Sequence, residues 1–496
     1  MGKLFVRKPL SLLLSEADNS EKGLKRTLSA GSLIALGIGA IIGAGLFVRT
    51  ATAAGQHAGS AVTISFIIAA VGCAFAGLCY AEFASMIPIA GSAYTYSYAT
   101  LGELVAWIIG WDLVLEYALG AATVAISWSE YLNKLCVSLF NFSIPYQWCH
   151  SPLQSSADGV SGIINLPAVL ILFLLSMLLI RGIQQSAVVN AIIVIVKVAI
   201  VILFICLGWK FINPANHTPY LIPADAGTIS MGGDKLLDYG KFWNHGWGGV
   251  VSGAGVVFFA FIGFDAVSTA AQETKNPKKA MPIGILVSLV ICTVLYILFS
   301  HVMTGVAPYK DFVTAGSEAS VAYTIDTYMP GYHWLSLFVT IAILAGFSSV
   351  ILVMLLGQTR VFFSMAKDGL VPPVFAKLHP KFRTPYKSQW LFFAFVSVFA
   401  AFLPESIVGD MTSIGTLFAF ILVCIGIIVM RKRNPEIPRA FKTPWVPLVP
   451  ILGAFVCLLM VVGLGLPNWL RLIGWLIIGF FIYFGYSVKH SKARKL

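Results

Sequence analysis

Charged residues are scarce in this sequence, and that scarcity excludes most classes of protein. Only 11% of the 496 residues are Asp, Glu, Lys or Arg, whereas soluble globular domains average about 25%. Hydrophobic residues make up 58%, which excludes a disordered chain. The composition also excludes a soluble enzyme and a nucleic-acid-binding domain, and it indicates a polytopic membrane protein surrounded by lipids. We attribute the net charge of +12 to membrane topology and expect no nucleic acid partner.

The eight cysteines do not suggest a disulfide framework. Six lie inside apolar runs, where a free thiol behaves as a small hydrophobic group: Cys73, Cys79, Cys206, Cys292, Cys424 and Cys457. Only Cys136 and Cys149 fall in a predicted loop, where a pairing between them stays open. The first apolar run follows an amphipathic segment and lacks the pattern of a signal peptide, so we expect a retained helix.

Twelve apolar runs reach or approach the length of about 20 residues that a helix needs to cross a bilayer. The sequence therefore predicts an all-α polytopic membrane protein with 12 transmembrane helices. The runs begin near Ala30, Ala61, Glu103, Ile163, Ala187, Gly248, Met281, Trp334, Trp390, Met411, Trp445 and Trp469.

The basic residues predict which side of the membrane holds the termini. With twelve spans both termini lie on one side, and that side carries 25 of the 33 Lys and Arg residues. Lys and Arg are enriched in cytoplasmic loops. We therefore expect a multi-pass protein of the plasma membrane, in a bacterium the inner membrane, with both termini in the cytoplasm.

Glycines interrupt the first and sixth runs. The first contains four glycines between Gly37 and Gly45, and the sixth combines scattered glycines with Asp265 in an apolar stretch. One interpretation of the first is close helix packing through the pair Gly39 and Gly43, a GxxxG motif. The other is a helix that breaks at mid-membrane and presents free backbone groups to a ligand, as transporters do in corresponding positions of two halves. Two repeats of five spans would place these helices first in each half and make the second half inverted.

Three further motifs give the chain a family resemblance. They are Arg360–Pro373, Glu273–Lys279 and Arg439–Pro444. Together with the interrupted helices, they resemble the amino acid–polyamine–organocation superfamily and most closely the bacterial branch of its cationic amino acid transporter family. The likeness runs from about Leu24 to the end of the chain.

The resemblance implies a fold and a division of the chain. The fold is the leucine-transporter type, with a 5+5 inverted repeat and two peripheral helices. The implied segments are a cytoplasmic N-terminal segment 1–29, the first repeat 30–213, an extracellular loop 214–246, the second repeat 247–431, the last two spans 432–488 and a cytoplasmic tail 489–496.

The resemblance also implies a site for the substrate. The α-carboxylate would meet backbone amides at Ile41, Gly43, Ala44 and Gly45, and the α-amino group would meet carbonyls at Phe264, Ala266 and Val267. Free amides at the amino end of a half-helix favour an anion, and free carbonyls at a carboxyl end favour a cation. Phe264 would be the aromatic gate over the substrate, although it is also one of 35 phenylalanines, most of which face lipid or core.

Ionisable residues inside apolar runs are costly and are functional candidates by default. Lys197 has no polar neighbour nearby in the sequence, so we expect either a proton-responsive coupling site or an inert contact with Asp265 or with carbonyls. In proton-coupled members of the superfamily, a fifth-span lysine stands where sodium-coupled members hold an ion. Asp112 and Glu116 share one helix face, and the resemblance places Glu116 at the floor of the pocket. For Asp112 and Glu82 we expect a role as cytoplasmic-side gate or as packing partners.

Met354 is the candidate for substrate selection. It is one of twelve methionines and an ordinary packing role remains open, but the resemblance places it beyond the substrate side chain. A thioether there would admit a small neutral amino acid such as alanine and obstruct lysine or arginine. We therefore expect a proton-coupled symporter of small neutral L-amino acids, working by alternating access.

Several alternatives remain. An exchanger or a cationic amino acid transporter is the main one, and a polyamine carrier is weaker. A membrane-embedded enzyme would need a cluster of His, Asp or Ser, but His301 is the only histidine that approaches a span. A channel fits the paired interrupted helices poorly. No cofactor or metal is expected. The expected partners are the amino acid, protons and lipids, and a small membrane subunit on the last two spans stays open.

Overall fold

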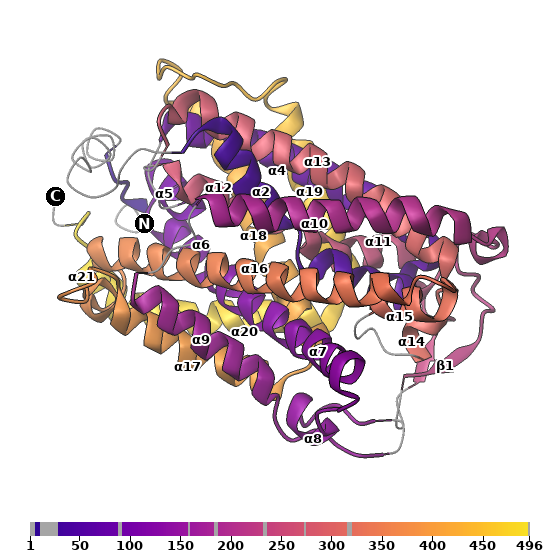
Figure 1. Ribbon diagram of the computed structural model, residues 1–496. Coiled ribbons are helices and arrows are strands. Elements are labelled where there is room, and N and C mark those ends of the chain that lie inside the picture. Colours follow the sequence, from indigo (N-terminus) through magenta and orange to yellow (C-terminus); the bar gives the residue numbers. More distant parts are fainter. Residues whose placement is uncertain are drawn as a thin grey trace.

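The computed structural model describes residues 5–9, 28–87, 92–156, 159–182, 187–231, 236–271, 274–314 and 320–494. Glu273, which opens one of the family motifs, and most of the segment 1–29 lie outside these residues. Helices dominate what is described (Figure 1). The longer ones are α2 (Ala30–Ile41), α4 (Val62–Met86), α6 (Glu103–Val114), α7 (Gly120–Phe140), α9 (Leu166–Ile180), α10 (Ala187–Gly208), α11 (Gly246–Val257), α13 (Pro277–Val306), α16 (His333–Lys367), α17 (Tyr386–Phe402), α18 (Glu405–Arg433), α19 (Leu448–Gly463) and α20 (Leu466–Ile482).

Apolar helices coincide with all twelve predicted runs. Within the described residues, eight helical stretches are long and apolar enough to cross a membrane. Four shorter apolar helices, α2, α9, α17 and α19, account for the other runs. A mostly helical membrane architecture is therefore confirmed, while the number of helices that cross the bilayer and the 5+5 inverted repeat stay predictions.

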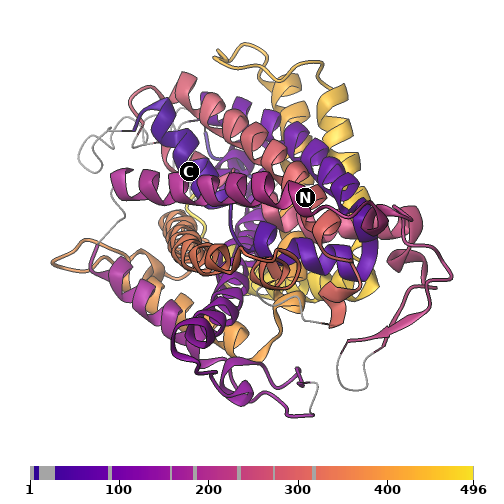
Figure 2. The same cartoon turned by 45° about the vertical axis from the view of Figure 1, so that its right-hand side comes forward.

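The helices run between two distinct ends of the molecule. Both tails reach one end, because Lys8 bonds Asp368 after α16, and Arg494 bonds Glu103 at the start of α6. We call this the tail end. The opposite end, here called the hairpin end, carries α8 (Tyr146–Cys149) and the antiparallel strands β1 (Thr228–Ser230) and β2 (Leu236–Asp238) (Figures 1 and 2).

The predicted loop at Cys136 is wrong in part. Helix α7 continues to Phe140, so Cys136 is helical and Cys149 lies in α8. Both thiols are free in the structure, and no disulfide joins them. The apolar sequence simply extends the helix beyond the expected end of the span.

Large apolar side chains cover the outside of the bundle. Ile195 is 66% exposed, Val290 62% and Phe481 75%. Exposed large apolar side chains of this kind suit contact with lipid or with another protein. Inside the bundle α2 lies against α10 and α13, and α13 lies along α4, so the first interrupted helix is enclosed by other helices.

Candidate functional site between two broken helices

The first interrupted helix breaks where the glycines predicted it. Helix α2 ends at Ile41, Ile42 is extended with ψ of 102°, and helical structure resumes as a π-helical turn at Gly45–Arg49. We call residues 42–44 the first break. Within the described part of the chain, the amides of Gly43, Ala44 and Gly45 have no hydrogen bond. These are three of the four amides expected to meet a carboxylate, and the fourth, that of Ile41, lies in the last turn of α2.

The sixth interrupted helix breaks as well. After α11, a 3₁₀ turn covers Phe258–Phe261, Ile262 is extended, and a one-turn helix, α12, resumes at Ala266–Thr269. We call residues 262–265 the second break. Gly263 has φ of +113°, a conformation that side chains disfavour. A Cβ there would also lie 3.0 Å from the carbonyl carbon and oxygen of Ala40.

The two broken helices therefore touch through their backbones. A Cβ on Gly45 would collide with the Cα of Ala260. Tyr296 of α13 joins them further, because its hydroxyl lies 2.9 Å from the carbonyl oxygen of Ile41 and 3.0 Å from that of Ala260. The sequence analysis missed Tyr296, although a hydroxyl in the middle of an apolar run was a signal for it.

Lys197 of α10 reaches the first break. Its Nζ donates to the carbonyl oxygens of Gly39 and Ile42, both at 2.9 Å. Its side chain lies against Gly346, where a Cβ would come within 2.5 Å of the lysine Cε. Of the alternatives considered, contact with carbonyls is the one observed, and no ion pair joins Lys197 to Asp265 among the described residues. The ammonium satisfies carbonyls that the break leaves without helical partners.

Glu116 and Asp265 form a buried pair of carboxyl groups. Glu116 lies in a π-helical turn, Leu115–Leu119, between α6 and α7, and its side chain interacts with Asp265 at the second break. The Tyr117 hydroxyl donates to Asp265 Oδ2 at 2.5 Å, and Ser92 does so at 3.4 Å. The Glu116 side chain also interacts with Thr416 of α18. The sequence analysis named both carboxylates but missed Tyr117.

The other three residues predicted to contact the substrate, Phe264, Ala266 and Val267, already contact other parts of the protein. Phe264 is fully buried and packs against the rings of Tyr80 and Phe420, with centroids 5.7 and 5.1 Å away. The carbonyl of Ala266 already accepts a bond from Thr269, and that of Val267 accepts one from the Ala270 amide. Two of the three carbonyls expected to meet an amino group therefore have protein partners in this structure.

One face of α16 contacts Lys197, the first break and the start of α7. Gly346, Val350 and Met354 follow one another at intervals of four residues, so they share a face. Gly346 lies against Lys197, Val350 against Gly43 of the first break, and Met354 against Gly120 at the start of α7. Met354 thus lies one helical turn from the first break.

Comparison with known proteins identifies the family. The family model for amino acid permeases matches residues 28–486. The chain is 44% identical to the branched-chain amino acid permease BcaP of Bacillus subtilis and 41% identical to the methylthioribose transporter of the same species, in each case over all of both chains. It is 32% identical to the vacuolar cationic amino acid transporter 4 of Arabidopsis thaliana, over 88% of this chain and 68% of the relative. The chain belongs to the amino acid permease family. It is therefore a membrane transporter and not an enzyme.

Buried ion pairs lie at both ends of the permease. At the tail end the buried carboxylate of Glu82 accepts bonds from Arg431, Arg439 and the backbone amide of Thr443. At the hairpin end the fully buried Arg49 pairs with Glu405, at 3.5 Å, and with Asp410. Glu82 is thus ion-paired between α4 and the end of α18, and its role as a gate or a packing partner stays a prediction.

Asp112 remains unassigned. Neither of its carboxylate oxygens has a hydrogen-bond partner among the described residues.

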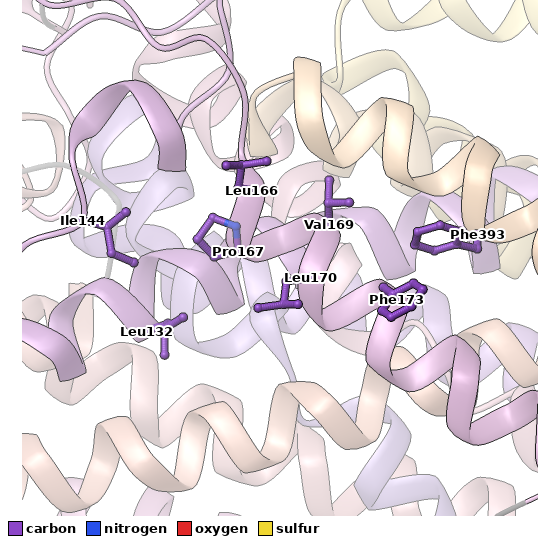
Figure 3. Close-up of a pocket in the computed structure, with 8 residues that line it drawn as sticks. All are labelled: Leu132, Ile144, Leu166, Pro167, Val169, Leu170, Phe173 and Phe393. Carbon is purple, nitrogen blue, oxygen red and sulfur yellow. The ribbon is translucent and has the colours of Figure 1, made fainter.

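A surface groove of the permease is unsuited to an amino acid. It has a volume of about 550 Å³ and is lined by Leu132, Ile144, Leu166, Pro167, Val169, Leu170, Phe173 and Phe393 (Figure 3). These side chains offer no polar atom to a carboxylate or an ammonium group. The buried region between the two breaks, which has both kinds of group, remains the candidate site.

Proposed function

We propose that this permease is a secondary active transporter that couples protons to the uptake of small neutral L-amino acids, such as alanine, by alternating access. The observation that carries the proposal is that Lys197, the first break and Met354 lie along one face of α16, while the Glu116–Asp265 pair lies at the second break. Both termini would lie in the cytoplasm, in the inner membrane of a bacterium, and the core would be the 5+5 inverted repeat of twelve spans.

Backbone groups at the breaks support an α-amino acid as the substrate. The free amides of Gly43, Ala44 and Gly45 suit a carboxylate, as helix amino ends do. The Asp265 carboxyl at the second break suits an ammonium group. Because the two broken helices touch beside the breaks, at Gly45 with Ala260 and at Gly263 with Ala40, both charged ends of one amino acid can be held together.

Two features support proton coupling. As an ammonium, Lys197 donates charge-assisted hydrogen bonds to the carbonyl oxygens of Gly39 and Ile42. A neutral amine donates weaker bonds, so loss of the proton would loosen the first break. Two carboxylates side by side in a dry interior are costly as two charges, so the Glu116–Asp265 pair is suited to hold a proton. Proton release would therefore alter both breaks in the same transport cycle.

Met354 supports a neutral side chain. It is 4% exposed and puts an apolar thioether, without any charge partner, one turn from the first break. A guanidinium or a second ammonium next to that sulfur would lose its hydration without compensation. A branched-chain amino acid is the second candidate, favoured by the likeness to BcaP over the whole chain.

Uptake into proteoliposomes tests the proposal. With an inward proton gradient and no sodium, we expect labelled alanine to accumulate in vesicles that contain no amino acid. Valine, leucine, isoleucine, arginine and methylthioribose form the competing panel. Accumulation that requires internal amino acid would contradict symport and establish exchange, and competition by arginine alone would contradict a neutral substrate.

A further inference from the structure

We infer that Gly120 determines how large a substrate side chain the permease accepts, because it provides the space in which the Met354 thioether lies. The inference rests on the proposed function and extends it from Met354 to its packing partner. A Cβ placed on Gly120 would lie 2.7 Å from Sδ of Met354, 3.3 Å from its Cε and 3.6 Å from Cγ2 of Thr412. The first of these distances is shorter than van der Waals contact allows.

Spacing along two helices places Gly120 one turn from Glu116 in the proposed substrate region. On its own segment, Gly120 follows Glu116 by four residues, so both face the same way. On α18, Thr412 and Thr416 repeat that spacing, and Thr416 interacts with Glu116. One layer thus holds Glu116 and Thr416, and the next layer, about 5.4 Å along, holds Gly120, Thr412 and Met354.

Because Gly120 has no side chain, the Met354 thioether can lie directly against the backbone of α7. Met354 is pressed onto the α7 backbone, with Thr412 at its side. Adding one methyl group at residue 120 would push Sδ away from α7 and back toward the region beside the first break, which Val350 and Gly43 border. The methionine side chain is flexible, so this displacement changes the shape of the site rather than the fold.

The accepted substrates are therefore neutral amino acids with aliphatic side chains, with an upper size limit fixed by the Gly120–Met354 contact. One methyl or methylene in an apolar pocket changes discrimination by about tenfold or more. We expect Gly120→Ala to lower the affinity for the largest accepted aliphatic amino acid about tenfold relative to glycine.

Ligand-induced thermal stabilisation of the purified full-length permease is the readout. Measurements on the wild type first identify the largest neutral amino acid that binds. The affinity ratio, defined as the affinity for that amino acid divided by the affinity for glycine, is then measured in each variant. Gly474→Ala is the matched control, because a Cβ there meets nothing within 4 Å, and its ratio should equal that of the wild type.

Two further variants separate the possible causes. Met354→Ala should raise the ratio, and it tests the inference even if Gly120→Ala fails to fold. In the Met354→Ala background, Gly120→Ala should leave the ratio unchanged, because no thioether remains to be displaced. An unchanged ratio in the single Gly120→Ala variant, or an equal loss in both backgrounds, would overturn the inference while leaving the proposed function intact. Failure of every amino acid to stabilise the wild type would overturn both.

Discussion

The ammonium of Lys197 donates a 2.9 Å hydrogen bond to the carbonyl oxygen of Ile42, the residue at which the first helix breaks. A second bond of the same length goes to Gly39. An isolated lysine in an apolar helix thereby becomes the partner of backbone groups that an unbroken helix would have satisfied itself. The break and the buried charge compensate each other.

Replacement of Lys197 by Ala should abolish accumulation driven by a proton gradient while leaving exchange of bound substrate measurable by counterflow. The reason is that the variant lacks the titratable donor to Gly39 and Ile42 but keeps the amides of the first break. Lys210→Ala is the matched control, since Lys210 is exposed at the end of α10. Full gradient-driven accumulation by Lys197→Ala would contradict the proposed coupling.

Glu116→Gln should flatten the dependence of substrate binding on pH. The amide keeps the shape of the side chain and removes one carboxyl from the pair with Asp265. Binding measured between pH 5 and 8 should change less in the variant than in the wild type. Asp112→Asn, one turn away on the same helix face, is the comparison and should keep the wild-type profile. A variant profile that matches the wild type would exclude Glu116 as a proton carrier.

Tyr296→Phe should destabilise the permease and weaken substrate binding together. The phenyl ring fills the same space, but the carbonyl groups of Ile41 and Ala260 lose their shared donor. A buried group left unsatisfied costs about 1–3 kcal/mol. Thermal unfolding with and without substrate measures both effects. Tyr486→Phe is the control, because no hydrogen bond of the Tyr486 hydroxyl is found in the described part of the chain. Loss of stability with unchanged affinity would limit Tyr296 to a structural role.

Glu103→Gln should loosen the tail end. The fully buried carboxylate accepts bonds from Arg494 at 2.7 Å, from Tyr483 at 3.0 Å and from Ser491. Gln keeps the shape of the side chain but cannot pair with the Arg494 guanidinium as a carboxylate does. We expect a lower melting temperature and faster tryptic cleavage after Lys492. The exposed Glu436 provides the control Glu436→Gln, which should leave both unchanged. Equal cleavage rates would show that Glu103 does not hold the tail.

Much of the architecture follows from local patterns. Long apolar runs form helices because a bilayer leaves backbone groups no other partner than their own segment. The glycines at Gly43 and Gly263 marked both breaks, since each stands where a side chain would meet another helix. The end of α7 was misplaced because sequence patterns locate a span better than they locate the end of a helix.

The sequence by itself determined the membrane class, the two broken helices, and the charges that topology does not require, Lys197 and Glu116 among them. Only the tertiary structure decided what those charges meet. Lys197 lies more than 150 positions along the chain from Gly39 and Ile42, and Asp265 is 148 positions from Tyr117. Helix periodicity says which face a residue occupies, but not which other helix lies opposite. The packing of α16, α13 and α10 around the breaks settles that, because side-chain size and shape select the neighbours.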